Sequence, residues 1–198
     1  MFFESGCVVC DDRRGPVCES CVRKLRPGAT HWRPHRVAVE LDEAALQLVA
    51  ALKYRRQRRL VGFMADRIAT ITPVAAEVLT WIPAAPHRVR QRGFDQAREI
   101  ARQVGVLTGM PVRRMLTRSR GDAQQTGRNR ADRLDGPDLH ALCQTAGLVV
   151  AVDDVVTTGA TIRSAARVLA DGGADRVVGV AFGGRSPHMR PAGPSTHT

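Results

Sequence analysis

One stretch of the chain combines an apolar strand, two carboxylates and a loop suited to phosphate. Leu148 to Val152 is an apolar run, Asp153 and Asp154 follow it, and residues 155–161 (Val-Val-Thr-Thr-Gly-Ala-Thr) lead into apolar residues at helical spacing. The run predicts a strand buried on both faces, as in a parallel sheet, that ends at the carboxylates. First-turn helix amides bind anions, and threonine hydroxyls and a glycine assist them. The stretch therefore suits a ligand with a phosphate and a nearby diol, such as a ribose 5-phosphate.

Two other nucleotide-binding patterns are absent from this sequence. No Gly-Lys-Ser/Thr follows the loop, which argues against a nucleoside-triphosphate P-loop. No Gly-x-Gly-x-x-Gly occurs, which argues against a dinucleotide site. The remaining alternative is an ordinary strand and helix with a threonine N-cap.

The run Val149 to Thr161 resembles the phosphoribosyl-pyrophosphate (PRPP) signature of type I phosphoribosyltransferases. In that family an acidic pair holds the ribose hydroxyls and the threonine loop holds the 5′-phosphate. The resemblance implies that Asp153 and Asp154 are the catalytic carboxylates and that Mg²⁺ accompanies PRPP. The PRPP-binding residues that it implies are Asp153, Asp154, Val155, Val156, Thr157, Thr158, Gly159, Ala160 and Thr161.

Four cysteines near the N-terminus form two Cys-x-x-Cys pairs, Cys7 with Cys10 and Cys18 with Cys21. Two such pairs can bring four thiolates to one tetrahedral Zn²⁺, and four thiolates leave no open position for catalysis. The pattern therefore predicts a structural zinc site. Disulfides are the rival interpretation, which a cytoplasmic location disfavours.

The bulk composition is that of a soluble globular protein with an unusual charge. The chain has 198 residues, of which 43% are hydrophobic, and it carries a net charge of +11 supplied almost entirely by arginine. No apolar run reaches the ~20 residues of a membrane span and no signal sequence is evident, so we expect a cytoplasmic protein without membrane contact. The charge favours polyanionic partners, PRPP or nucleic acid, or it reflects an arginine-rich composition alone.

The periodicity of the remaining chain predicts alternating strands and helices. Strands are expected at 37–41, 77–82, 112–116 and 175–182. Helices are expected from an N-cap at Asp42 to residue 52, at 60–71 and at 94–107. His31 and His35 are expected on the surface of a linker. The fold class is therefore α/β, with a parallel sheet flanked by helices and a small N-terminal module that resembles a zinc ribbon.

Three cationic or polar segments are candidates for binding pyrophosphate. Lys53 is one of only two lysines and follows an apolar helix. Arg88, Arg90 and Arg92 follow two prolines, which predict an extended loop at the same sheet edge as Asp153. Gln125 and Arg128 lie in a glycine-containing polar stretch that is either a plain loop or a lid over the pyrophosphate.

Several of these segments together resemble the ComF family of phosphoribosyltransferase-like proteins. The matching features are the four cysteines, Lys53-Tyr54, the block from Pro83 to Ala97, the Gln125 region and the PRPP loop. Asp95 stands where the family usually has asparagine. The family is associated with competence and DNA uptake. The resemblance implies a zinc module and linker at 1–35 and a phosphoribosyltransferase-like domain at 36–185, while composition predicts a disordered tail at 186–198.

Two functions from different classes follow from these expectations. The first is an enzyme that transfers the phosphoribosyl group of PRPP to an acceptor that the sequence does not identify, with release of pyrophosphate. The second is a non-catalytic module that senses PRPP or binds single-stranded DNA or a partner protein, such as a DNA-uptake protein. A zinc-dependent DNA-binding protein without a PRPP site would leave the Asp153 stretch unexplained.

Overall fold

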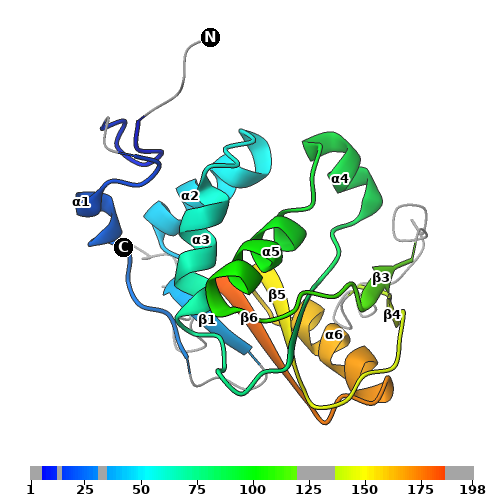
Figure 1. Ribbon diagram of the computed structural model, residues 1–198. Coiled ribbons are helices and arrows are strands. Elements are labelled where there is room, and N and C mark those ends of the chain that lie inside the picture. Colours follow the sequence, from blue (N-terminus) through cyan, green and yellow to red (C-terminus); the bar gives the residue numbers. More distant parts are fainter. Residues whose placement is uncertain (1–5, 13–14, 31–34, 120–136, 186–198) are drawn as a thin grey trace, which may run out of the picture.

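The computed structural model describes residues 6–12, 15–30, 35–119 and 137–185. Its centre is a parallel sheet with the strand order β1-β6-β5-β2 (Figure 1). These strands span β1 His35–Glu40, β2 Val78–Trp81, β5 Leu148–Val156 and β6 Arg176–Gly184. An antiparallel pair, β3 Leu116–Arg118 with β4 Leu139–Ala141, stands apart from this sheet. The expected α/β class with a parallel sheet is confirmed.

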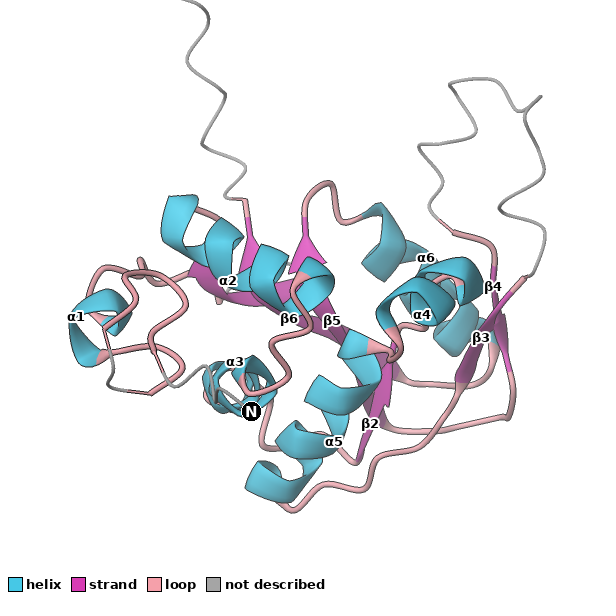
Figure 2. Ribbon diagram, turned by 90° about the horizontal axis from the view of Figure 1, so that it is seen from above, coloured by secondary structure: helices cyan, strands magenta, loops and turns pink. Residues whose placement is uncertain are grey.

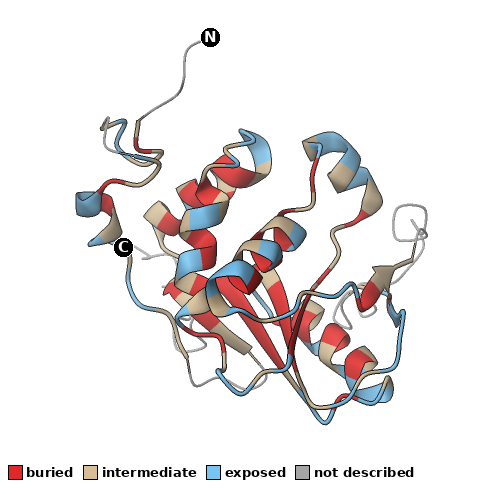
Figure 3. Ribbon diagram, viewed as in Figure 1, coloured by how far each residue is buried: buried red, intermediate tan, exposed pale blue. Residues whose placement is uncertain are grey.

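Helices cover both faces of the parallel sheet, as the view from above shows (Figure 2). Helices α2 Glu43–Tyr54, α3 Leu60–Ala69 and α5 Gln96–Thr108 pack on one face against Val150, Val152 and Phe182. Helix α6 Ala160–Asp171 packs on the other face against Val149 and Ala151, where β3 and β4 extend the core. Buried residues accordingly follow the strands and the inner sides of these helices (Figure 3).

The central strand β5 is longer than the sequence predicts. Its pairing with β6 continues beyond the apolar run, through Asp153 opposite Ala181 to Val156 opposite Gly184. The backbone ladder does not depend on side-chain polarity, and successive side chains of a strand point to opposite faces. The two carboxylates therefore lie within the last part of the strand, on opposite faces of the sheet, rather than after it.

Helix boundaries agree with the capping signals at two positions. The Asp42 carboxylate accepts a hydrogen bond from the Ala45 amide at 2.9 Å and caps α2, as predicted. The Asp95 carboxylate accepts one from the Arg98 amide at 3.3 Å and caps α5. Both satisfy a first-turn amide that has no partner within the helix.

The expected extended loop after Pro83 is wrong, because residues 86–92 form helix α4, Pro86–Arg92. Pro86 occupies the first helical turn, where its missing amide hydrogen is not needed, and Gly93 ends the helix at φ +83°. The strand expected at 112–116 is also displaced: Val112 makes an isolated bridge to Leu79, and β3 begins at Leu116.

The four-cysteine segment, which includes the short helix α1 Glu19–Val22, leads directly into the edge of the sheet. Three backbone hydrogen bonds at 2.9–3.0 Å join residues 26–29 to residues 37–40, so this segment runs antiparallel along β1. Four apolar residues of the segment also contact the main core: Val8, Val9, Val17 and Leu25. The module is therefore packed onto the domain that follows it.

No helix within the described ranges is both long and apolar enough to cross a membrane. The stretches that were expected to form a lid around Gln125 and a tail after residue 185 lie outside the described residues.

Gly179 determines how closely α6 approaches the sheet. A Cβ added at Gly179 would lie 2.4 Å from the Ile162 side chain, and one added at exposed Gly62 in α3 would meet nothing within 4 Å. We expect Gly179→Ala to lower the free energy of unfolding by about 1–3 kcal/mol through overpacking. Gly62→Ala should raise it by about 0.5–1 kcal/mol, because alanine favours the helix. Urea denaturation of both variants checks this, and equal effects would contradict the packing argument.

Candidate functional site

The carboxylate of Asp154 forms an ion pair with Lys53 at the end of the central strand. The distance between Lys53 Nζ and Asp154 Oδ1 is 2.9 Å, and the two side chains are only 21% and 12% exposed. Lys53 comes from the last turn of α2, so the ion pair joins this helix to β5. Because little solvent reaches this pair, water and salt screen it weakly, and each charge is stabilised mainly by the other.

Asp153 lies on the opposite face of β5 and has an unusually high pKa. Burial, followed by the neighbouring Asp154 carboxylate, raises the pKa of Asp153 to about 8. Its Oδ1 accepts a hydrogen bond from the Asp154 amide at 2.8 Å, and this bond lowers the pKa in part. Its side chain keeps some exposure to solvent, so water screens part of this effect.

A third carboxylate, Asp95, lies in the same electrostatic environment. Besides capping α5, it accepts a hydrogen bond from the Ala84 amide through Oδ2 at 3.2 Å. Burial raises its pKa, and the negative charge of Asp154 contributes in the same direction. Asp95, Asp153 and Asp154 thus place three carboxyl groups together at this edge of the sheet, and Lys53 pairs with Asp154 among them. Grouped carboxyl oxygens are ligands that a hard cation can use, and a bound cation would lower their pKa values.

The loop between β5 and α6 carries exposed hydroxyls and a glycine turn at the start of a helix. Thr157 and Thr158 are exposed, and Gly159 turns the chain into α6 with φ +74°. The Thr158 hydroxyl accepts a hydrogen bond from the Ala160 amide at 3.3 Å. The Arg163 guanidinium donates to the Thr158 carbonyl at 2.8 Å. The first turn of α6 thus follows directly on the two carboxylates, and helix starts of this kind can bind anions.

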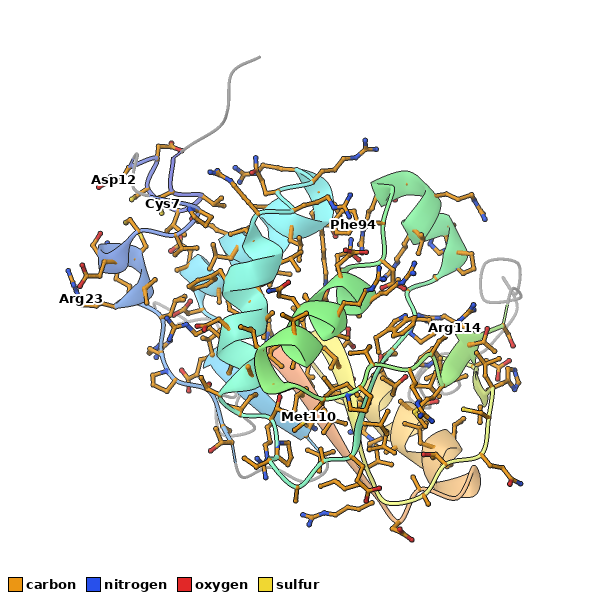
Figure 4. All side chains as sticks on the ribbon, viewed as in Figure 1. Cys7, Asp12, Arg23, Phe94, Met110 and Arg114 are labelled. Atoms are coloured by element: carbon orange, nitrogen blue, oxygen red, sulfur yellow. The ribbon has the colours of Figure 1, made fainter. Side chains whose placement is uncertain are left out.

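The arginines of α4 lie beside the turn between α2 and α3. Arg92 lies over the exposed ring of Tyr54, with its guanidinium carbon 5.6 Å from the ring centroid. Arg56 donates to the Gln91 carbonyl at 3.1 Å. Figure 4 shows side chains gathered in this region, near the labelled Phe94. The α2–α3 turn and α4 therefore form one continuous basic rim at the end of α2.

The backbone of this rim contains one unusual conformation. Arg56 has φ +53°, a left-handed conformation that residues with a side chain rarely adopt. Arg58 adds a second contact, with its guanidinium carbon 5.0 Å from the centroid of the Phe94 ring. The rim is held by contacts from both sides, and exposed Arg88 and Arg90 project from it without forming an ion pair among the described residues.

The four N-terminal cysteines form a candidate metal centre. The sulfur atoms of Cys7, Cys10, Cys18 and Cys21 all lie within 4.8 Å of one another. Those of Cys10 and Cys18 are 3.5 Å apart, and none of the cysteines forms a disulfide. Four sulfurs around Zn²⁺ at about 2.3 Å stand about 3.8 Å apart. The cluster therefore fits a tetrahedral metal ion. The Ser20 hydroxyl, 3.1 Å from Cys18, lowers the pKa of that thiol to about 6.

The structure brings together many of the residues that the sequence singled out, and not others. Asp153, Asp154, Lys53 and the Thr157–Thr161 loop lie around the end of β5 and the start of α6. Val155 and Val156 contribute strand backbone. Gln125 and Arg128 fall outside the described residues.

Two residues near the loop were missed or misplaced by the sequence analysis. His35 is a partly buried residue of β1, not a surface residue of a linker, and its Cε1 would lie 3.2 Å from a Cβ at Gly159. Arg163 contacts the loop directly. A cation in the first turns of a helix opposes the helix dipole, and this was the signal that could have identified Arg163.

Comparison with known proteins gives similarities of architecture only. No protein-family model and no curated protein matches the chain. The allosteric regulatory enzyme of purine biosynthesis is 20% identical, over 61% of this chain and 25% of that one, with a TM-score of 0.43. Glutamine PRPP amidotransferase from B. subtilis, complexed with ADP and GMP, is 22% identical, again over 61% of this chain and 25% of that one, with a TM-score of 0.43.

A hypothetical protein from Neisseria gonorrhoeae with bound ppGpp is 16% identical, over 70% of this chain and 77% of that one, with a TM-score of 0.35. The chain spans about a quarter of the length of the first two structures. Similarities of this size assign neither a substrate nor a reaction to this chain.

The raised pKa of Asp153 predicts a specific dependence of stability on pH. The unfolded chain loses this proton near the ordinary value of 3.8, and the folded protein keeps it up to about 8. Between these values the folded state binds more protons, so this residue makes stability fall as the pH rises. Asparagine cannot titrate, and Asp153→Asn should therefore be more stable than the wild type at pH 8 and nearly equal to it at pH 4.

The expected gain at pH 8 is about 2 kcal/mol, since solvent screens part of the effect, and this corresponds to roughly 4–8 °C in Tm. Thermal melts of both proteins at several pH values measure it. A constant difference between the two proteins across this range would show that Asp153 does not carry the raised pKa.

Proposed function

We propose that this protein binds PRPP at the edge formed by β5 and α6. The observation that carries the proposal is the joint position of two carboxyl groups at the end of β5 and a threonine loop at the start of α6, all within eight residues of one another in the chain. Thr157 to Thr161 would hold the 5′-phosphate with backbone amides and hydroxyls. Asp153 and Asp154 would hold the ribose hydroxyls, which lie a few ångströms from that phosphate.

The grouped carboxyl oxygens at this edge fit a divalent cation that accompanies the ligand. Burial, and then the charge of Asp154, raises the pKa values of Asp153 and Asp95, and a bound cation would favour their ionised forms. Mg²⁺ prefers oxygen ligands of this kind and bridges carboxylates and phosphates. When bound, it would neutralise charge on the pyrophosphate of PRPP.

The basic rim supplies the other half of the proposed chemistry. In a transfer reaction, an acceptor lone pair attacks C1 of the ribose while the C1–O bond breaks and its electrons leave with pyrophosphate. Arg88, Arg90 and Arg92 would stabilise the charge that develops on pyrophosphate. If Lys53 exchanged Asp154 for a phosphate oxygen, the bound cation would have to take over the Asp154 carboxylate, since each charge of this little-exposed pair depends on a partner. These segments resemble those of ComF proteins, and this resemblance supports the proposal that the protein is a phosphoribosyltransferase of that family.

The alternative is a module that binds PRPP without turning it over, or that binds single-stranded DNA or a protein. One observation favours it: the rim is an exposed row of arginines beside an exposed aromatic ring, Tyr54. Arginines beside an aromatic ring are typical of surfaces that bind single-stranded nucleic acid. An association with DNA uptake would use this surface.

The four-cysteine cluster is proposed to hold one structural Zn²⁺. Four thiolates at tetrahedral spacing fill the coordination sphere, which leaves no position for substrate. The metal would instead hold residues 6–12 and 15–21 in the fold that packs against the core and continues into the segment along β1.

Calorimetric titration with PRPP in the presence of Mg²⁺ tests the proposed site. We expect wild type to bind and the isosteric double variant Asp153→Asn/Asp154→Asn to lose at least tenfold in affinity, because an amide cannot ionise and offers one acceptor oxygen where a carboxylate offers two. A matched control, Asp66→Asn/Asp171→Asn, removes two exposed carboxylates elsewhere on the surface and should bind as wild type does.

Pyrophosphate release, measured in the same samples, separates the two functions. Slow release by wild type and none by the double variant would support the transferase. Binding without release, with and without candidate acceptors, would favour the sensing module. Absence of PRPP binding, together with salt-sensitive binding of single-stranded DNA, would refute the PRPP site.

Metal analysis tests the zinc proposal. We expect about one zinc per chain in wild type, and loss of the metal together with at least about 2 kcal/mol of stability in Cys18→Ser. Cys143 is exposed and lies outside the cluster, so Cys143→Ser should keep both metal and stability. If wild type purified without a chelator contained no metal and still gave a sharp thermal melt, the proposal would be contradicted.

A further inference from the structure

Arg163 holds one particular peptide group of the phosphate loop. Its Nη1 donates a 2.8 Å hydrogen bond to the carbonyl oxygen of Thr158. In a planar trans peptide the carbonyl and the following amide point in opposite directions. The bond to the Thr158 carbonyl therefore also sets the direction of the Gly159 amide, which belongs to the same peptide group.

Of the peptide groups in the loop, this one can flip most easily. Gly159 has no side chain and sits at φ +74°, so rotation of the preceding peptide meets little steric resistance. If the peptide flipped, a carbonyl oxygen would replace an amide hydrogen on the side of the loop where an anion binds. Affinity for phosphate then depends on whatever keeps the group in its present orientation.

The surroundings of Gly159 support such a locking role for Arg163. A Cβ at Gly159 would lie 2.9 Å from Arg163 Nη1 and 3.2 Å from His35 Cε1, so the loop packs closely against both side chains. Burial, and then the charge of Arg163, lowers the pKa of His35. His35 is therefore neutral at pH 7, and Arg163 is the cation behind the loop.

The position of Arg163 is otherwise unfavourable. It is exposed near the start of α6, where the helix dipole disfavours a cation, and it pairs with no carboxylate in the described part of the chain. An arginine placed there only for solubility would be better placed at the other end of the helix. The bond to Thr158 gives this residue a local function.

We infer that Arg163 is a positioning residue that locks the Thr158–Gly159 peptide with its amide toward the ligand, and thereby sets the affinity for the terminal phosphate of a ribose 5-phosphate. This inference rests on the proposed function of the loop. The affinity of the loop for phosphate would then be set by the Arg163 side chain, which lies behind the loop and need not touch the ligand.

The test compares two arginines one helical turn apart. Arg167 is also exposed on α6 and carries the same charge, but it lies one turn farther from the loop. We expect Arg163→Ala to weaken binding of ribose 5-phosphate about tenfold in calorimetry and to leave binding of inorganic pyrophosphate with Mg²⁺ within twofold. Arg167→Ala should leave both unchanged, and Arg163→Lys, which can still donate to the carbonyl, should recover most of the affinity.

Thermal melts of the variants separate positioning from folding. Both alanine variants should melt within about 2 °C of wild type, because both side chains are exposed. Equal losses for ribose 5-phosphate and pyrophosphate in Arg163→Ala, or equal effects of the two alanine substitutions, would overturn the inference and leave the PRPP site in place. If wild type bound pyrophosphate but not ribose 5-phosphate, both the inference and the proposed phosphate loop would fail.

Discussion

The ion pair between Lys53 and Asp154 is the interaction on which the arrangement of this edge depends. It connects the last turn of α2 to the central strand, in a place where neither side chain is well solvated. Tyr54 and Arg56 follow Lys53 closely in the chain, and their contacts hold α4. The ion pair thus connects the basic rim to the central strand. A bound anion that competes for Lys53 would act on the same contact, so ligand binding and the position of the rim are physically linked.

Much of this fold was predictable, because its signals are local and strong. The apolar run at 148–152, the cap at Asp42 and the two Cys-x-x-Cys pairs each specify a structure within a few residues, and the structure contains all three. The order of strand, polar loop and helix also placed the threonines at the start of α6 correctly. These predictions rest on backbone hydrogen bonding and side-chain periodicity, which depend little on distant parts of the chain.

The errors arose where distant contacts decide the outcome. Pro86 was interpreted as fixing an extended loop, although proline also favours the first turn of a helix, and the contacts between α4 and the α2–α3 turn are long-range. His35 was assigned to a linker because its partners, Gly159 and Arg163, are more than 120 residues away. The ladder with β6 likewise extended β5 through two carboxylates that local polarity suggested would end it.

The two edges of the parallel sheet are both occupied by irregular chain. Residues 26–29 run along β1, and the segment around Val112 hydrogen-bonds to Leu79 on β2. Strand addition, by which many proteins dimerise or capture extended peptides, needs an unpaired edge. Over these positions that route is closed. At these two edges, self-association or recognition of another macromolecule would therefore depend on side chains, and would respond to salt and surface charge more than to backbone complementarity.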